Sequence, residues 1–316
     1  LRWALRMGRA TRFLNALVPR TLRPMLAMVP DSLPPAIGLA PVSSPLGKPR
    51  ARVALLAGCA QQVLDPQINA ATIRVLVRHG VEVLVPPRQG CCGALGWHVG
   101  ESERARTAAL RLMDVMPAEV DAIVSNAAGC GSGMQEYPLL LAGTPHEERA
   151  RAFAAKVKDI AVLLVELGIE PVPPVPATRV AYHDACHLAH AQGVRAAPRQ
   201  LLRSIPGVEV VEVRDSGICC GSAGTYNIDQ PEIAARLGAA KAEAIRETAC
   251  QVVAAGNIGC LVQIRRQLEA LCGPLPVEHP VVLLDRAYRG VSLLDGKTTQ
   301  VPNVSESSVD QGVAVR

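Results

Sequence analysis

Two pairs of adjacent cysteines constrain this chain more than any other feature. Cys91 and Cys92 form the first pair, Cys219 and Cys220 form the second pair 128 residues later, and a glycine follows each pair. Two adjacent cysteines do not readily form a disulfide with each other inside one tight turn. Next to glycine, however, both thiolates can face the same metal centre. The pattern therefore predicts two metal clusters rather than disulfides.

Each pair belongs to a set of four cysteines with nearly the same spacing. In the first set 31 residues separate the first cysteine from the pair and 37 residues separate the pair from the last cysteine. In the second set the corresponding numbers are 32 and 39. The predicted metal ligands are Cys59, Cys91, Cys92 and Cys130 in the first set, and Cys186, Cys219, Cys220 and Cys260 in the second. Cys250 and Cys272 have no counterpart in the first half, so we expect that neither binds metal.

Four thiolates suit an iron–sulfur cubane, and neighbouring glycines let backbone N–H groups approach an anionic cluster. Four thiolates also satisfy tetrahedral zinc. The short Cys-x2–4-Cys knuckles that are usual for structural zinc do not occur in the sequence. The spacing therefore favours iron–sulfur clusters of the 4Fe–4S type, and zinc in one site or in both stays open.

The segments around the cysteines predict an α/β fold with two tandem repeats in pseudo-twofold relation, each a small, mostly parallel sheet flanked by helices. Predicted strands cover 51–58, 81–85, 121–125, 179–183, 208–213 and 251–255, and predicted helices cover 66–79, 101–116, 145–167, 231–247 and 281–288. Each predicted ligand then lies just past the carboxyl end of a strand or in the following loop. Open α/β sheets bind their ligands at this edge.

The chain of 316 residues has room for two domains. We expect a basic amphipathic leader and linker at 1–50, a first cysteine-rich domain at 51–145, and a connecting helix with a Pro-rich linker at 146–178. A second cysteine-rich domain follows at 179–290. The polar tail at 291–316 has little to bury, so we expect it to be disordered.

The leader carries most of the positive charge. Residues 1–52 contain nine Lys or Arg and one acidic residue, whereas the remainder contains 24 basic and 27 acidic residues. One face of its predicted helix holds Trp3, Met7, Ala10, Leu14, Leu17 and Val18. Such a helix docks on an anionic membrane surface or an acidic partner, or it packs on its own domain with a solvated arginine face. The chain begins with Leu1, so we expect further sequence upstream.

Cysteine usage predicts a cytoplasmic protein. Ten cysteines are too dilute for a disulfide-stapled scaffold, and no signal peptide precedes the first repeat. The chain has no run of about 18 apolar residues, so any membrane association would be peripheral, at the inner face of the cell membrane. An aromatic content of 3% argues against a nucleic-acid partner.

Polar residues also surround Cys186. His183, Asp184, His187 and His190 are candidates for binding metal or moving protons, but we favour a supporting, hydrogen-bonding role. The glycines of 129–133 do not have the G-x-G-x-x-G spacing, which excludes nicotinamide binding there.

Both repeats resemble the cysteine-rich CCG domain that occurs in heterodisulfide reductases, in lactate-utilisation iron–sulfur proteins and in the iron–sulfur subunit of glycolate oxidase. Three segments are similar in particular to the glycolate oxidase family: 182–188 (YHDACHL), 219–227 (CCGSAGTYN) and 256–260 (GNIGC). The full family pattern ends in Cys-x-x-Cys, but Ala127 and Asn257 occupy the first of these positions. This departure argues against the five-cysteine, noncubane cluster of heterodisulfide reductase. The ferredoxin-like segment of the glycolate oxidase subunit is also missing, so either the chain is part of a longer protein or those clusters are lost.

The resemblance implies an electron-transfer subunit of an oxidoreductase, with no catalytic residue of its own. Partner flavoprotein subunits would oxidise glycolate to glyoxylate, and this chain would carry the electrons towards quinone. A lactate-oxidising complex of the same domain family is one alternative. A zinc-stabilised scaffold that only holds flavoprotein subunits together is the alternative from a different class.

Overall fold

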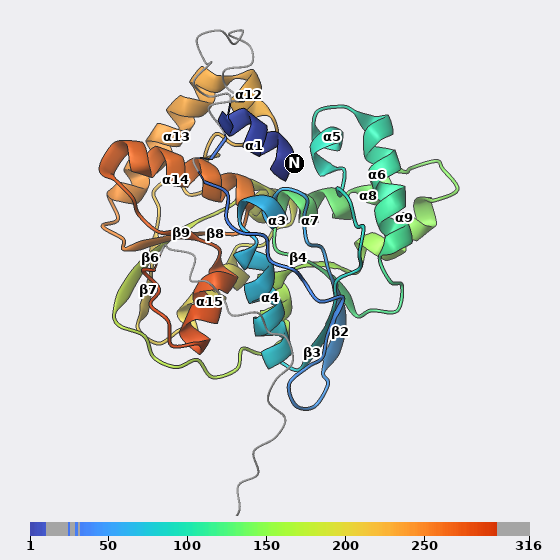
Figure 1. Cartoon of the computed structure of the whole chain (residues 1–316), viewed down its shortest axis with the longest axis horizontal. Coiled ribbons are helices and arrows are strands. Elements are labelled where there is room, and N and C mark those ends of the chain that lie inside the picture. Colours follow the sequence, from blue (N-terminus) through green and yellow to red (C-terminus); the bar gives the residue numbers. More distant parts are fainter. Residues whose placement is uncertain (11–24, 26–28, 31, 296–316) are drawn as a thin grey trace, which may run out of the picture.

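Two small sheets, one in each half of the chain, organise the structure (Figure 1). The computed structural model describes residues 1–10, 25, 29–30 and 32–295. The first sheet has the strand order β1-β3-β2-β4-β5 and the second has the order β7-β6-β8-β9. Strand β1 is antiparallel to β3, and all other neighbouring strands are parallel. The predicted α/β fold with two mostly parallel sheets is therefore confirmed.

The strands are β1 (Val42–Ser43), β2 (Ala51–Leu55), β3 (Val81–Leu84), β4 (Ala122–Ser125), β5 (Val157–Asp159), β6 (Thr178–His183), β7 (Val208–Glu212), β8 (Val252–Ala255) and β9 (Val277–Glu278). The described helices are α1 (Arg2–Ala10), α3 (Gln61–Leu64), α4 (Gln67–Arg78), α5 (Ala94–His98), α6 (Ser102–Val115), α7 (Ala128–Gln135), α8 (Tyr137–Leu140), α9 (Glu147–Ala154), α10 (Ile160–Leu167), the π-helix η3 (His187–Ala191), α11 (Ala196–Arg203), α12 (Tyr226–Asp229), α13 (Pro231–Arg246), α14 (Ile258–Cys272) and α15 (Pro280–Tyr288).

The central strands have the composition of parallel strands that are covered on both faces. Val53 in β2, Val124 in β4, Val180 in β6 and Val253 in β8 have no exposed surface. Continuous apolar runs of this kind are stable only where helices cover both sides of the sheet. The apolar runs therefore predicted the strand positions closely.

The single helix predicted for 145–167 is wrong, because the strand β5 divides this segment into α9 and α10. Val157 pairs with Ile123 of β4, which extends the first sheet. The buried side chain of Asp159 then accepts a hydrogen bond from the Ala161 N–H at 2.8 Å and caps α10. A short strand that gains its partner only in the tertiary structure leaves little periodicity in the sequence.

The second sheet has a corresponding fourth strand, β9, which the sequence pattern did not predict. His279 follows β9, and its side chain accepts a hydrogen bond from the Val281 N–H at 3.2 Å. Each half of the chain therefore ends its sheet with a short strand, a capping side chain and a helix.

These last helices pack across the boundary between the halves. Helix α15 contacts α4 of the first half, as Figure 1 shows, and α10 contacts α11 of the second half. Arg74 of α4 forms a bidentate ion pair with the buried Asp285 of α15, with bonds of 2.8 and 2.7 Å. One continuous apolar cluster contains buried residues of both sheets, including Val53 and Val180. The two halves therefore share a core.

The described part of the leader forms helix α1, which has no buried residue. Trp3 and Met7 are 74% and 48% exposed, and the Arg2 guanidinium donates to the Pro34 carbonyl at 2.7 Å. Leu14, Leu17 and Val18 lie outside the described residues, as does residue 296 onwards of the predicted tail. Within the described part of the chain no helix is long and apolar enough to cross a membrane.

The two capping side chains are expected to give opposite pH dependences of stability. Burial raises the pKa of Asp159 to about 7 and lowers the pKa of His279 to about 3. The stabilising contribution of Asp159 is full below its unfolded pKa of about 3.9 and is lost as the pH rises through 7. The contribution of His279 is full above its unfolded pKa of about 6.5 and is lost as the pH falls towards 3.

Between about pH 4 and 6.5 Asp159 makes the unfolding free energy fall with pH, whereas His279 makes it rise. Substituting one residue at a time should separate the two contributions. We expect the unfolding free energy of Asp159→Asn to rise with pH over this range, and that of His279→Asn to fall. Urea denaturation at half-unit pH steps measures both slopes. Slopes identical to that of the unsubstituted protein in both variants would contradict the expectation.

Candidate metal centres

The four cysteines of the first set come from three loops at the carboxyl edge of the first sheet. Cys59 lies in the turn between β2 and α3, the pair lies between β3 and α5, and Cys130 lies in the first turn of α7. Hydrogen bonds connect Cys59 to Cys91, Cys91 to Cys92, and Cys92 to Cys130. The fold thus brings together four thiols that are up to 71 residues apart in the sequence.

The second set repeats this arrangement. Cys186 immediately precedes the π-helix η3, the pair lies between β7 and α12, and Cys260 lies in the first turn of α14. Hydrogen bonds connect Cys186 to Cys219, Cys219 to Cys220, and Cys220 to Cys260. All ten cysteines of the chain are free thiols in the structure.

Crowding of the thiols divides their acidities within each set, because hydrogen bonds among them raise the pKa of Cys59, Cys92, Cys186 and Cys220 above the usual value and lower the pKa of others. Hydrogen bonds from Cys59 and then from Cys92 lower the pKa of Cys91 to about 2, and those from Cys186 and Cys220 lower the pKa of Cys219 to about 2. The bond from Cys220 also holds the pKa of Cys260 well below its usual value. Thiolates, not thiols, bind metals, so each set offers at least one thiolate at neutral pH, and a cation bound there would displace the protons of the other thiols.

Two glycines turn backbone N–H groups towards the sulfurs. Gly93 and Gly221 have left-handed φ angles of 82° and 90°. Their N–H groups donate to the sulfurs of Cys91 and Cys219 at 3.4 and 3.3 Å. A Cβ atom at position 221 would lie 2.3 Å from the Ala234 carbonyl oxygen, so no other residue fits this turn without a shift.

His183 stands beside the second set. A ring nitrogen of His183 and the sulfurs of Cys220 and Cys260 all lie within 4.8 Å of one another. The imidazole is 1% exposed; its ring interacts with the Cys260 thiol, and neither ring nitrogen has a partner in good hydrogen-bond geometry. A buried imidazole without a partner is costly, so this pocket fits a bound group that ligates or accepts from the ring. The thiolates and the open imidazole together fit a metal ion or an iron–sulfur cluster.

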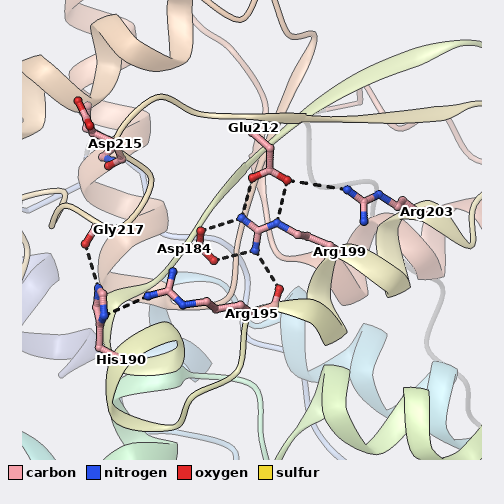
Figure 2. A network of polar contacts seen from close by, with 9 residues as sticks. Asp184, His190, Arg195, Arg199, Arg203, Glu212, Asp215 and Gly217 are labelled. Carbon is pink, nitrogen blue, oxygen red and sulfur yellow. Dashed lines mark hydrogen bonds and ion pairs between the residues drawn. The ribbon is translucent and has the colours of Figure 1, made fainter.

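Asp184 and His190, two of the predicted supporting residues, brace the loops through hydrogen bonds with oxygen and nitrogen atoms rather than with sulfur. Figure 2 shows Arg199 of α11 between two carboxylates, paired with Asp184 at 2.8 and 2.7 Å and with Glu212 of β7 at 2.8 and 2.7 Å. Burial raises the pKa of Asp184, but hydrogen bonds from Arg199 and Ser216 outweigh it, and the net pKa lies below its usual value.

In the same view, His190 contacts the Gly217 carbonyl at 3.1 Å and links η3 to the loop that carries the second cysteine pair (Figure 2). The network therefore fixes the distance between the segment before Cys186 and the segment before Cys219.

Sequence reasoning missed three residues at the second set. Ser222 lies 3.3 Å from the sulfur of Cys220, and the Asn257 side-chain amide donates to the sulfur of Cys260 at 3.6 Å. Apart from the charge of Arg199, nothing in the sequence indicated that this residue supports the second set. Asn257 did have a signal, since it stands where the family pattern has cysteine, but the sequence alone indicated only a lost ligand.

Similarity to known proteins covers most of the chain. The CCG cysteine-rich domain matches residues 53–135 and again residues 180–265. A probable glycolate oxidase iron–sulfur subunit of Bacillus subtilis is 37% identical over 76% of this chain and 55% of its own length. The glycolate oxidase iron–sulfur subunit of Escherichia coli is 33% identical over 84% of this chain and 65% of its own length. Lactate utilization protein A of Oceanobacillus iheyensis is 29% identical over 76% of this chain and 98% of its own length.

The chain thus spans a little over half to two thirds of the two glycolate oxidase subunits that it matches. The two domain matches together cover more than half of the chain, and each contains one complete set of four cysteines. This protein belongs to the family defined by the CCG cysteine-rich domain, which it carries in two copies.

Proposed function

We propose that each set of four cysteines holds an iron–sulfur cluster of the 4Fe–4S type. The observation that carries this proposal is that four thiols converge in each half of the chain, with backbone N–H groups directed at one sulfur of each pair. The proposed ligands are Cys59, Cys91, Cys92 and Cys130, and Cys186, Cys219, Cys220 and Cys260. Support also comes from the two similar glycolate oxidase proteins, which are named as iron–sulfur subunits.

The proposed role is electron transfer within an oxidoreductase complex, without catalysis at carbon in this chain. When bound, iron–sulfur clusters accept and release single electrons. The residues of this chain bind the clusters, exclude water from Cys92, Cys220 and Cys260, and hold the three cysteine loops of each set in place. Flavoprotein subunits that oxidise glycolate to glyoxylate are the proposed donors, and quinone is the proposed acceptor.

The proposed location is the cytoplasmic face of the membrane, with peripheral attachment. Helix α1 supports it, because Trp3 and Met7 are exposed on a helix that also carries Arg2, Arg6 and Arg9. Basic amphipathic helices of this kind bind anionic lipid surfaces.

Anaerobic purification followed by iron, zinc and acid-labile sulfide assays tests the cluster proposal. We expect two clusters per chain and an electron paramagnetic resonance signal after reduction. Two equivalents of zinc with no iron would contradict the proposal and would favour the non-redox scaffold.

Lactate is the second candidate substrate for the complex, because a lactate utilization protein aligns over 98% of its own length. The chain should be inert towards both acids by itself. Mixed with glycolate-oxidising flavoprotein subunits, and with any upstream ferredoxin-like segment restored, it should support reduction of a quinone. Activity with lactate and not glycolate would select the alternative, and oxidation by this chain alone would contradict an electron carrier.

A further inference from the structure

The two cysteine sets differ in the side chains that surround them. Aligning the sequences of the two repeats on their cysteines pairs four polar residues of the second half with four apolar residues of the first. The polar residues are His183, His187, Ser222 and Asn257, and their counterparts in the same order are Leu56, Ala60, Ala94 and Ala127. Each polar residue lies at a sulfur of the second set.

Asn257 is held in place from both halves of the chain. Its side-chain amide nitrogen donates to the Cys260 sulfur at 3.6 Å, and its side-chain oxygen accepts from the Gly129 N–H at 3.3 Å. Because Gly129 precedes Cys130, the same amide connects the second set to the loop of the first. With the oxygen occupied by an N–H donor, the NH2 group is fixed towards sulfur.

The remaining three residues add contacts to the other sulfurs. Ser222 lies 3.3 Å from the Cys220 sulfur, and the Nδ1 atom of His187 lies 3.8 Å from the Cys186 sulfur. The His187 ring is also stacked on His98 of the first half, with centroids 4.9 Å apart. His183 lies buried next to Cys220 and Cys260, and its ring interacts with the Cys260 thiol.

Hydrogen bonds to the ligand sulfurs are one of the main determinants of the reduction potential of an iron–sulfur cluster. Reduction adds negative charge, and an N–H or O–H group that points at sulfur stabilises the more negative state. We propose that Asn257 and Ser222, together with His183 and His187, are positioning residues that raise the reduction potential of the second centre and make the two centres electronically distinct. The inference rests on the proposed function, since it concerns a cluster bound at these cysteines.

Solvent also raises the reduction potential of a cluster, and it acts mainly at the first set. Cys59 and Cys91 are exposed, whereas no cysteine of the second set is exposed. The difference between the two potentials therefore mixes two effects. Substitution of the donors separates them, because it changes the second set and leaves the exposure of the first set unchanged.

The test is a redox titration of the anaerobically purified full chain, followed by electron paramagnetic resonance. The signal that is lost in Cys220→Ser identifies the second cluster. We expect the double variant Ser222→Ala/Asn257→Ala to lower the midpoint potential of that cluster only. At the original midpoint, the ratio of oxidised to reduced cluster should rise roughly tenfold, which corresponds to about 59 mV for a one-electron couple.

Asn257→Asp is the second variant, because it keeps an oxygen for the Gly129 N–H and replaces the donor at Cys260 by an acceptor. It should lower the same potential even if the double variant does not retain its cluster. Ser132→Ala is the matched control, since this buried hydroxyl donates to the Gly129 carbonyl oxygen and not to a sulfur.

Unchanged potentials in variants that hold both clusters would overturn this inference and leave the proposed function intact. Equal shifts of both clusters would overturn it as well. Protein that contains zinc and no iron would overturn the proposed function and this inference together.

Discussion

Replacing Cys220 with serine is expected to remove about half of the iron and sulfide, because one of four thiolate ligands is lost in one of two sites. Cys220 is 1% exposed and has direct hydrogen bonds with Cys219 and Cys260, so no solvent ligand can easily take its place. The cluster bound by the first set should remain, since none of its four ligands changes and serine, which is similar in size to cysteine, takes the place of Cys220 within the shared core.

Iron and sulfide assays on matched anaerobic preparations measure the loss, and electron paramagnetic resonance shows which signal disappears. Cys250→Ala and Cys272→Ala are the matched controls. Cys250 is partly buried and Cys272 is exposed. The Cys272 thiol bonds to the Leu268 carbonyl and the Cys250 thiol bonds to Thr248, not to a cysteine of the two sets. Both controls should keep the full metal content. Loss of iron in either control, or loss of both clusters in Cys220→Ser, would contradict the assignment of eight ligands in two sites.

Replacing Arg199 with leucine should destabilise the protein by about 3–5 kcal/mol, because removal of one partner leaves a buried charge without compensation. The side chain of Asp184 is 1% exposed and that of Arg199 is 14% exposed, so neither is well solvated (Figure 2). Arg199 also holds Glu212, so its loss releases the end of β7 from the segment that leads to Cys186.

Arg203→Leu is the matched control on the same helix. Arg203 is 58% exposed and approaches Glu212 only to 3.9 Å, so its removal should cost about 1 kcal/mol or less. Anaerobic urea denaturation of the metal-loaded variants measures the difference. The double variant Asp184→Asn/Arg199→Leu should recover part of the stability lost in Arg199→Leu, because the uncompensated carboxylate is gone. Equal losses in Arg199→Leu and Arg203→Leu would show that the buried ion pair does not stabilise the fold.

The sequence determined the features that depend on local composition and on repetition. Segments such as 51–55 and 252–255 are strands because a parallel sheet covered on both faces requires continuous hydrophobic residues. The matched spacing of the cysteines located both sets, because a repeated fold places equivalent positions at equivalent strand ends. The glycine after each pair indicated a tight turn, since Gly93 and Gly221 adopt backbone angles that other residues rarely adopt.

Only the tertiary structure decided how the two halves are joined. The segment 157–159 is a strand because Ile123 and its neighbours offer an open edge, and three residues carry too little pattern to show this in advance. The same holds for α15, whose amphipathic pattern predicts a helix but does not name α4 as its partner. Asn257 makes the point most directly: its sequence position shows a missing cysteine, whereas its two hydrogen bonds, to Gly129 and to the Cys260 sulfur, exist only because the fold brings the two cysteine sets to a common boundary.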